Sequence, residues 1–167
     1  MDDAAFTIVR IDETAAERLA PLMADFRVTL RAYRGIVSEP DVPAAEEEIA
    51  DFLKAGYPIF AAEEAGELAG YLVCRIETGC LWAEYFYVRP EYRRRGVGSL
   101  LFARAEEEAA ALGGDTVFNF VHPNNQGMID FLRAKGYTVL NMIEIRKPWP
   151  GEKLTSTIHV EDNAFDY

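Results

Sequence analysis

The segment from Val88 to Leu101 carries the residues of this 167-residue chain that are best suited to hold an anion. It reads Val-Arg-Pro-Glu-Tyr-Arg-Arg-Arg-Gly-Val-Gly-Ser-Leu-Leu, an arginine-rich turn that leads into an amphipathic helix. Gly96 and Gly98 have no side chains to cover the backbone, so the first amides of the helix can approach a phosphate closely. The arginines at 93–95 add positive charge beside those amides. The pattern predicts a phosphate-binding turn, and a surface turn with an arginine cluster is the alternative.

Other phosphate-binding motifs fit this segment less well. No Gly-Lys-Ser/Thr follows, which disfavours a P-loop, and there is neither a third glycine nor an initial βαβ unit, which disfavours a dinucleotide-binding fold. Apart from this turn the chain is acidic, with a formal net charge of -11. Such a charge repels the phosphate backbone of nucleic acids, so we expect no nucleic-acid partner and favour cationic small molecules.

The elements that must position this turn follow from hydrophobic periodicity and turn residues. Strands are expected over residues 6–11, 58–64, 67–77, 80–88, 116–121, 137–145 and around 155–160. Helices are expected from about Thr14 to Arg34, after Pro43 with its acidic residues 46–48 facing outward, from Gly96 to Leu112, and from Asn124 or Asn125 to Gly136. This order predicts an α+β fold, in which helices flank both faces of a mixed, mostly antiparallel sheet as three layers.

Composition places these elements in one domain. Half of the residues are apolar, and residues 1–150 are expected to form a single domain to which 151–167 add a strand and an acidic tail. No stretch approaches the roughly 18 apolar residues that cross a bilayer, and Met1–Ala5 precedes no apolar run, so we expect a cytoplasmic protein without a membrane partner. Cys74 and Cys80 lack metal-site spacing, so buried free thiols and no bound metal are expected.

Two motifs resemble the GNAT superfamily of acyl-CoA-dependent N-acetyltransferases. The first is Arg93-Arg-Arg-Gly96-Val-Gly98, which is similar to the Arg/Gln-x-x-Gly-x-Gly/Ala signature between the fourth strand and third helix of that family. The second is Asn125, followed eleven residues later by Gly136 and an aromatic residue. Both motifs stand on the expected elements, and the resemblance in element order extends from about Phe6 to Ile145.

The resemblance implies acetyl-CoA as co-substrate and gives a set of cofactor-binding residues. In this family the strand before the turn parts from its neighbour and pairs with pantetheine, while the helix amides hold the pyrophosphate. The implied set is Phe86, Tyr87, Val88, Arg93, Arg94, Arg95, Gly96, Val97, Gly98, Ser99 and Asn125. For Asn125, a role as a helix N-cap is an equally open interpretation.

The catalytic residues depart from the family pattern. Leu132 stands where many members carry a tyrosine that protonates the thiolate, and Phe120 stands where some carry a glutamate. An amine must be neutral to attack, so a base is expected. Glu84 is the first candidate, because strand alternation places it on one face in an apolar row with Trp82, Phe86 and Val88. The alternatives for Glu84 are an arginine partner or solvent. His122 is a second candidate for proton transfer, with a structural role as its alternative.

These observations predict transfer of acetyl from acetyl-CoA to a primary amine by direct attack. We expect a cationic acceptor because the chain is acidic. A catalytically inactive CoA-binding regulatory or structural domain is the competing interpretation. The sequence leaves open the acceptor, the general acid and the oligomeric state, for which a homodimer is one option. It also leaves open the tail Glu161–Tyr167, which either is disordered or docks on a partner subunit.

Overall fold

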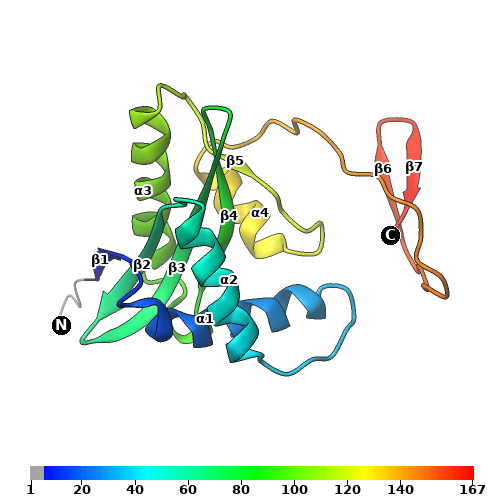
Figure 1. Ribbon diagram of the computed structural model, residues 1–167. Coiled ribbons are helices and arrows are strands. Elements are labelled where there is room, and N and C mark those ends of the chain that lie inside the picture. Colours follow the sequence, from blue (N-terminus) through cyan, green and yellow to red (C-terminus); the bar gives the residue numbers. More distant parts are fainter. Residues whose placement is uncertain (1–5) are drawn as a thin grey trace. The chain divides into compact units, whose positions relative to one another are not determined.

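The computed structural model describes residues 6–167 (Figure 1). Residues 1–5, in which no secretion signal is expected, lie outside the described part. The chain divides into two compact units, of which the first ends at Asp130 and the second comprises Phe131–Tyr167. The expected single domain over 1–150, with 151–167 as its strand and tail, stays a prediction. Within residues 6–167, no helix combines the length and the apolar character needed to cross a membrane.

The first unit is built on a five-stranded sheet. Its order is β1 (Thr7–Arg10), β2 (Ile59–Glu64), β3 (Glu67–Glu77), β4 (Cys80–Val88) and β5 (Phe118–Asn119). All neighbours are antiparallel except β4 and β5, which are parallel. The turn residues Ala65-Gly66 and Thr78-Gly79 all have positive φ, between 49° and 85°, which is the backbone that tight two-residue hairpins need. The predicted meander is therefore confirmed.

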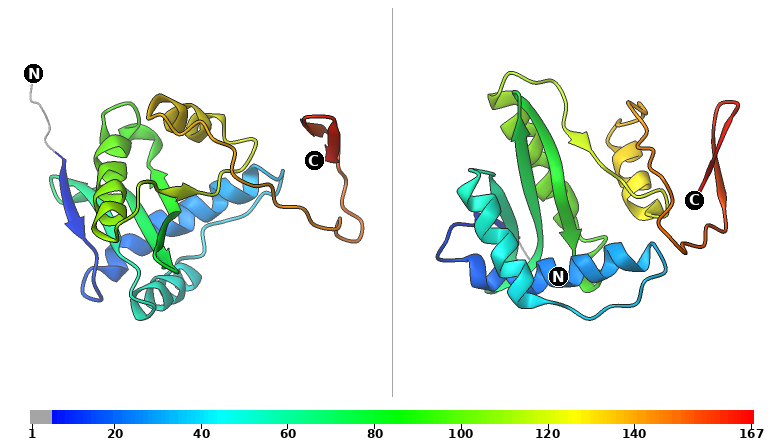
Figure 2. Two further views of the ribbon diagram at one scale, coloured as in Figure 1. Left: turned by 90° about the horizontal axis from the view of Figure 1, so that it is seen from above. Right: turned by 45° about the vertical axis from the view of Figure 1, so that its right-hand side comes forward.

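Helices cover both faces of this sheet (Figures 1 and 2). Helices α1 (Ala16–Ala32) and α2 (Val42–Lys54) pack against one another and share a core with alternate residues of β2, β3 and β4. Helix α3 (Val97–Ala111) packs against β2, β3 and β4 from the other side. The predicted α+β class, with a mostly antiparallel sheet between helical layers, is confirmed. Fully buried members of the α1–α2 core include Leu19, Leu22, Met23, Ile49, Ile59, Tyr71 and Val73.

The last helix and the C-terminal hairpin complete the chain. Helix α4 (Gln126–Ala134) begins after Asn125 and is followed by Gly136, whose φ of 87° ends it as expected. Strands β6 (Thr157–Val160) and β7 (Asn163–Asp166) form an antiparallel hairpin. Tyr167 closes it, because its amide donates to the Ser156 carbonyl at 2.9 Å and its own carbonyl accepts from the Ser156 amide at 2.9 Å. The acidic tail is thus ordered as part of a hairpin, and its docking on a partner stays a prediction.

Two expectations about strands are wrong. Residues 137–145 form no strand, although they are rich in β-branched and apolar side chains. A strand requires a partner for its backbone groups, and within residues 6–167 this segment has no strand beside it. The expected strand 116–121 shortens to Phe118–Asn119, the two residues that pair with β4.

Candidate active site

The turn between β4 and α3 has the backbone shape of an anion-binding site. A short 3-10 helix, η1 (Pro90–Tyr92), leads into it, and Arg94 and Gly96 both have positive φ, 62° and 85°. Helix α3 then begins at Val97 with Gly96 as its N-cap, and no side chain of residues 6–167 caps its first amides. The first amides of a helix have no partner within the helix and lie at the positive end of its dipole. They are thus available to a ligand.

The three arginines of the turn differ in what holds them. Arg93 Nε donates to the Val88 carbonyl at 2.9 Å, which fastens the turn to the end of β4. Arg95 pairs with Glu64 at 2.6 Å and its guanidinium lies 5.0 Å from the ring centroid of Phe6. Arg94 is exposed and forms no ion pair with any residue from 6 to 167. Arg94 is therefore the arginine most readily offered to a ligand.

Strands β4 and β5 part just before this turn. They pair only at Trp82 with Phe118 and at Ala83 with Asn119. From Tyr85 to Val88, β4 pairs with β3 on one side and has no strand partner on the other side among the described residues. Unpaired backbone amides and carbonyls on this stretch can bind an extended ligand in the manner of an added strand.

Two further features fit a CoA arm in this opening. Asn119 donates through Nδ2 to the Val117 carbonyl at 2.9 Å, while its Oδ1 is buried without a hydrogen-bond donor from the described part of the chain. A buried acceptor without a donor is costly unless a ligand or water satisfies it. At the far end of the opening, a Cβ at Gly70 would lie 2.6 Å from the Tyr87 carbonyl oxygen, so only glycine lets β3 approach β4 there. The residues present therefore fit the cofactor that the turn implies.

The structure places the expected pantetheine residues on both faces of β4. Phe86 faces α3, where its ring centroid lies 6.0 Å from that of Phe102. Tyr87 is buried on the opposite face, 5.6 Å from the ring of Phe26 in α1. Val88 pairs with Gly70 at the last position of the strand. Because the side chains of Phe86 and Tyr87 pack against helices, the backbone of these residues is the part that would be available to pantetheine, and the contact itself stays a prediction.

Glu84 occupies a β-bulge, which sequence alternation did not predict. Val73 pairs with Tyr85 and Cys74 with Ala83, so Glu84 is the extra residue of β4. The bulge reverses the alternation beyond it. The prediction that Trp82, Glu84, Phe86 and Val88 share one face is therefore wrong, since Phe86 faces α3 while Trp82 pairs with Arg75 on the other face.

The carboxylate of Glu84 has an arginine partner. Arg75 Nε donates to Glu84 Oε2 at 2.7 Å, and the guanidinium lies 5.1 Å from the Trp82 ring centroid. The same arginine also pairs with Glu77. Glu84 is the main cause of the raised pKa of Arg75, through their hydrogen bond. The arginine partner left open by the sequence is thus present, and it occupies one of the two carboxylate oxygens.

A second carboxylate lies where α1, α2 and β4 meet, and the sequence interpretation missed it. Glu48 was expected to face solvent, but its Oε1 accepts from the Tyr85 hydroxyl at 2.7 Å. Arg27 Nε lies 3.0 Å from Oε2, although no donor is aligned to form a hydrogen bond with that buried atom. Burial, followed by the bond to Glu48, raises the pKa of Tyr85. Helical spacing in the sequence indicates an inward position for Glu48, because the residue lies on the helix face that carries the buried residues Ala45 and Ile49.

His122 and Asn125 lie in the loop that leads to α4. The His122 ring stacks on Tyr33 with centroids 5.4 Å apart, and its Nδ1 accepts from the Asn124 amide at 3.3 Å. Burial and, second, the charge of Arg34 lower the pKa of His122. Asn125 Oδ1 accepts from the Met128 amide at 3.1 Å, so its role as a helix N-cap is confirmed, while its contact with CoA stays a prediction.

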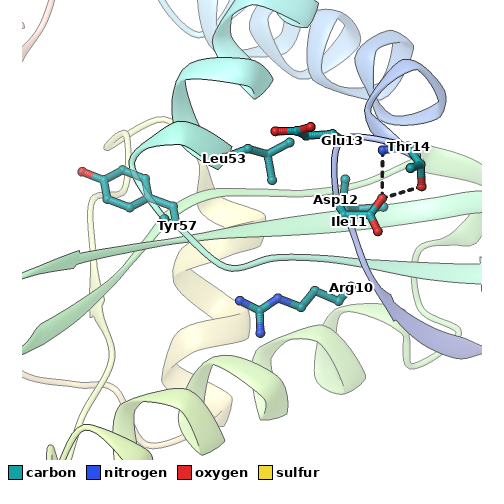
Figure 3. Close-up of a pocket in the computed structure, with 8 residues that line it drawn as sticks. Arg10, Ile11, Asp12, Glu13, Thr14, Leu53 and Tyr57 are labelled. Atoms are coloured by element: carbon teal, nitrogen blue, oxygen red, sulfur yellow. Dashed lines mark hydrogen bonds between the residues drawn. The ribbon is translucent and has the colours of Figure 1, made fainter.

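The two cysteines and an open surface depression near the end of β1 lie outside this chemistry. Burial raises the pKa of Cys74 to about 12, and Cys80 is only half-buried, which corrects the expectation of two buried thiols. Residues 6–167 contain no group of three or more side chains that could hold a metal ion. Figure 3 shows an open depression in which the Asp12 carboxylate accepts from the amide and hydroxyl of Thr14. Its lining residues, Arg10, Ile11, Asp12, Glu13, Thr14, Leu53, Gly56 and Tyr57, include none from β4 or the arginine turn.

Comparison with known proteins agrees with this geometry. The chain matches the acetyltransferase (GNAT) family over residues 23–137. Among solved structures it is similar to AAC(6')-Iy in complex with the bisubstrate analog CoA-S-monomethyl-acetylneamine, with 21% identity and a TM-score of 0.66. That alignment covers 87% of this chain and 99% of the other.

Two further solved structures have the same fold at lower identity. One is a ribosomal-protein-alanine N-acetyltransferase from Brucella melitensis biovar Abortus 2308, with 17% identity, a TM-score of 0.66, and coverage of 87% and 100%. The other is a transcriptional regulator from Bacillus halodurans C-125, with 15% identity, a TM-score of 0.66, and coverage of 86% and 100%. The family match spans well over half of the chain, and the sheet, the parted strands and the turn agree with it; the chain belongs to the acetyltransferase (GNAT) family.

Proposed function

We propose that this protein transfers the acetyl group of acetyl-CoA to a cationic primary amine by direct attack. The observation that carries the proposal is the uncapped N-terminus of α3, which lies one short turn after a stretch of β4 that has no strand partner on its outer side among residues 6–167. This combination offers amides to a pyrophosphate and backbone groups to an extended pantetheine. The solved structure of AAC(6')-Iy with a CoA-linked acetylneamine supports both halves of the reaction.

The residues that would hold CoA follow from this arrangement. The amides of residues 94–99 and the Arg94 side chain would bind the pyrophosphate. The backbone of residues 86–88 would pair with pantetheine. The buried Oδ1 of Asn119 would accept a hydrogen bond from an amide of pantetheine. Asn125 would contact the cofactor from the start of α4. None of these contacts requires a metal.

The amine must lose a proton before or during attack, and Glu84 is the proposed base. Its carboxylate lies on the bulge where β4 and β5 part, and it is 26% exposed, so a small amine can reach it. The Arg75 guanidinium then serves to orient the carboxylate. His122 is the alternative group for proton transfer, since its lowered pKa keeps the ring neutral at neutral pH. No covalent enzyme intermediate is proposed, because the raised pKa of the buried Cys74 makes that thiol a poor nucleophile.

The acceptor and the location of the protein belong to the proposal as well. AAC(6')-Iy acts on an aminoglycoside and the Brucella enzyme on a ribosomal protein, so family members differ in the amine that they acetylate. The net charge of -11 favours an acceptor that carries a further positive charge. We also propose that the protein is cytoplasmic, where acetyl-CoA and such amines are both present.

The test is the release of free thiol when protein, acetyl-CoA and a panel of amines are mixed. The panel contains polyamines, aminoglycosides, amino acids, and peptides with a free N-terminus or a lysine. We expect thiol release with at least one cationic amine, and none with a Gly98→Asp variant. If acetyl-CoA binds in calorimetry but no amine releases thiol, the protein is instead a catalytically inactive CoA-binding domain. If acetyl-CoA does not bind at all, the site assignment is wrong.

A further inference from the structure

A small pocket lies on the α1 side of the sheet, where the first turns of α1 meet the turn between β2 and β3 (Figure 1). Its volume is about 280 Å³, and all of its lining residues belong to the first unit. They are Arg18, Pro21, Gly66, Glu67, Leu68 and Arg89. None of them is among the residues proposed to hold CoA or to prepare the amine. The pocket, here called the Arg18–Arg89 pocket, is therefore separate from the site already described.

The backbone of Arg89 is fixed beside the end of β4. Its amide donates to the Ala69 carbonyl at 2.9 Å, which continues the pairing of β3 with β4 by one residue. Pro90 follows, and a residue before proline prefers the extended backbone that Arg89 has, with a ψ of 140°. These two constraints determine where the Arg89 side chain begins, and neither of them engages its charge.

The guanidinium of Arg89 has no anionic partner within residues 6–167. Its Nε is buried without a hydrogen-bond acceptor, and no carboxylate of that range forms an ion pair with the side chain. A buried donor without an acceptor costs free energy, and the cost is greater when the donor is charged. An anion bound in the pocket would supply the acceptor.

Arg18 brings a second guanidinium to the pocket from the first turn of α1. Its Nη2 donates to Glu63 Oε2 at 2.8 Å and to the Gly66 carbonyl at 3.0 Å, so both bonds use one nitrogen. The positive end of the α1 dipole adds to the potential at this position. Because Glu63 neutralises part of the Arg18 charge, we expect Arg89 to contribute more than Arg18 to the attraction of an anion.

The two guanidiniums favour a phosphate group over a carboxylate. Each guanidinium presents N–H groups in a planar fork that matches two oxygens of one anion. A carboxylate has two oxygens and can satisfy one such fork, whereas a tetrahedral phosphate can accept from two forks that approach from different directions. Arg18 belongs to α1 and Arg89 follows β4, so the two forks reach the pocket from different elements.

We propose that the Arg18–Arg89 pocket is a second anion site, which binds a phosphate group separately from the CoA pyrophosphate. The pocket borders the turn that is proposed to bind CoA, since the Tyr92 amide donates to the Arg89 carbonyl at 3.0 Å. The two sites nevertheless use different donors, which are side chains in the pocket and mainly the α3 amides in the turn. The proposal does not depend on acetyl transfer.

The test is a titration of the isotope-labelled full chain with inorganic phosphate at constant ionic strength, followed by nuclear magnetic resonance. The signals to follow are the Nε–H group of Arg89 and the amides of residues 66–68, and we expect saturable shifts in both. The shifts should persist in protein saturated with CoA and in Gly98→Asp, because CoA and this substitution act on the turn and not on the pocket. A failure of the proposed CoA site would thus be distinguished from a failure of this proposal.

Four variants examine the contribution of charge in the pocket. Arg89→Gln should raise the dissociation constant for phosphate about tenfold or more, because charge-assisted hydrogen bonds are lost. Arg89→Lys keeps the charge and should lose less. Glu67→Gln should bind phosphate more tightly than the parent, since it removes a negative charge from the lining, and misfolding cannot produce such a gain. Arg31→Gln, in the last turn of α1, removes one positive charge outside the pocket and should bind like the parent.

Three outcomes would overturn the proposal. The first is the absence of saturable shifts at Arg89, including shifts confined to residues 94–99. The second is an equal loss of affinity in Arg89→Gln and Arg31→Gln, which would reduce the binding to general attraction by positive charge. The third is displacement of phosphate from Arg89 by CoA, with Arg89→Gln weakening CoA more than dephospho-CoA. That result would assign the pocket to the ribose phosphate of the co-substrate and exclude a separate site.

Discussion

The three arginines of the turn are consecutive in sequence but differ in the contacts that their side chains make. Arg93 and Arg95 are held by the Val88 carbonyl and by Glu64, so they stabilise the turn itself. Arg94 has a positive φ and an exposed side chain, which is an unusual backbone for a residue other than glycine. The left-handed residues at 94 and 96 bend the chain so that successive amides can converge on one anion.

The first prediction distinguishes the contribution of the α3 amides to CoA binding from that of the Arg94 side chain. Gly98→Asp should abolish CoA binding, because it adds bulk and a negative charge beside the amides that face the pyrophosphate. Arg94→Ala should weaken binding by less than about tenfold, since an exposed charge contributes about 1 kcal/mol or less. Calorimetric titration with CoA measures both, and Arg31→Ala in the last turn of α1 is the matched control. A Gly98→Asp variant that binds like the parent would remove the pyrophosphate site from this turn.

The second prediction concerns Glu84. Positioned bases contribute on the order of a hundredfold to ten-thousandfold, so Glu84→Gln should lower kcat/KM for the amine in that range near neutral pH. CoA affinity should be unchanged, and a higher pH should restore part of the rate, since solvent then deprotonates the amine. Leu132→Tyr should change the rate only a few-fold, because a coenzyme thiolate leaves without a dedicated acid.

Glu77→Gln is the matched control for Glu84, because Glu77 pairs with the same Arg75 and is exposed. This control should keep the parental kcat/KM. Equal losses in both variants would mean that the carboxylates only hold Arg75 in place. Parental activity of Glu84→Gln across the pH range would move the search for a base to His122.

The third prediction uses the lowered pKa of His122. The unfolded chain binds a proton at this histidine near its ordinary pKa of 6.5, whereas the folded chain does so only at lower pH. The contribution of His122 to the free energy of unfolding should therefore be constant above about pH 6.5. It should fall as the pH drops from 6.5 through the pKa of the folded state. His122→Gln should flatten this decline in urea unfolding. An unchanged pH dependence in the variant would assign the decline to other groups.

At the scale of elements, β3 approaches β4 closely at the end of the stretch that has no β5 partner. Gly70 lies opposite Val88, and a Cβ there would lie 2.6 Å from the Tyr87 carbonyl oxygen and 3.1 Å from Val88 Cα. Both contacts are with backbone atoms, which no side-chain rotation can relieve. The last two residues of β4 would therefore have to move.

The fourth prediction is that Gly70→Ala lowers both stability and CoA affinity. Overpacking of this kind costs about 1–3 kcal/mol, which is measurable in urea unfolding, and the displaced β4 backbone should bind CoA more weakly. Gly127→Ala is the control, since its nearest neighbour to a new Cβ, Asn125 Oδ1, is 4.0 Å away. Alanine within helix α4 should be neutral or stabilising. Parental CoA affinity in Gly70→Ala would show that the end of β4 does not contact the cofactor.

The sequence predicted the elements whose signals are local. The hairpins at Ala65-Gly66 and Thr78-Gly79, the stop of α4 at Gly136 and the turn at Arg94–Gly96 all follow from residues a few positions apart. The failures concern partners distant in sequence. Residues 137–145 have the composition of a strand, but no strand of residues 6–167 pairs with them. The bulge at Glu84 arises from pairing with β3 rather than from β4 itself. The acidic neighbours of Glu48 led to the prediction that it faces solvent, although its helical spacing from Ala45 indicates the buried face.

At the scale of the whole molecule, charge is distributed unevenly between residues 1–130 and residues 131–167. The excess of acidic residues lies entirely in residues 1–130, which also contain the cationic turn proposed to bind CoA. An anionic cofactor therefore meets local positive charge within an acidic surrounding. The proposed cationic acceptor would be attracted by the acidic surface instead, and this difference would separate the two substrates electrostatically.

The last prediction is that the acceptor carries a positive charge besides the amine that reacts. Two acceptors of equal length, a diamine and the corresponding amino alcohol, differ only in that second charge, and kcat/KM should be higher for the diamine. The difference should shrink as salt is added, because the Debye length falls from about 10 Å at 0.1 M to about 3 Å at 1 M. Glu46→Gln/Glu47→Gln on α2 should reduce the preference more than Glu107→Gln/Glu108→Gln, which changes net charge equally on α3, across the sheet. An amino alcohol that reacts as well as the diamine, or a preference indifferent to salt, would show that the acidic surface serves solubility and not recognition.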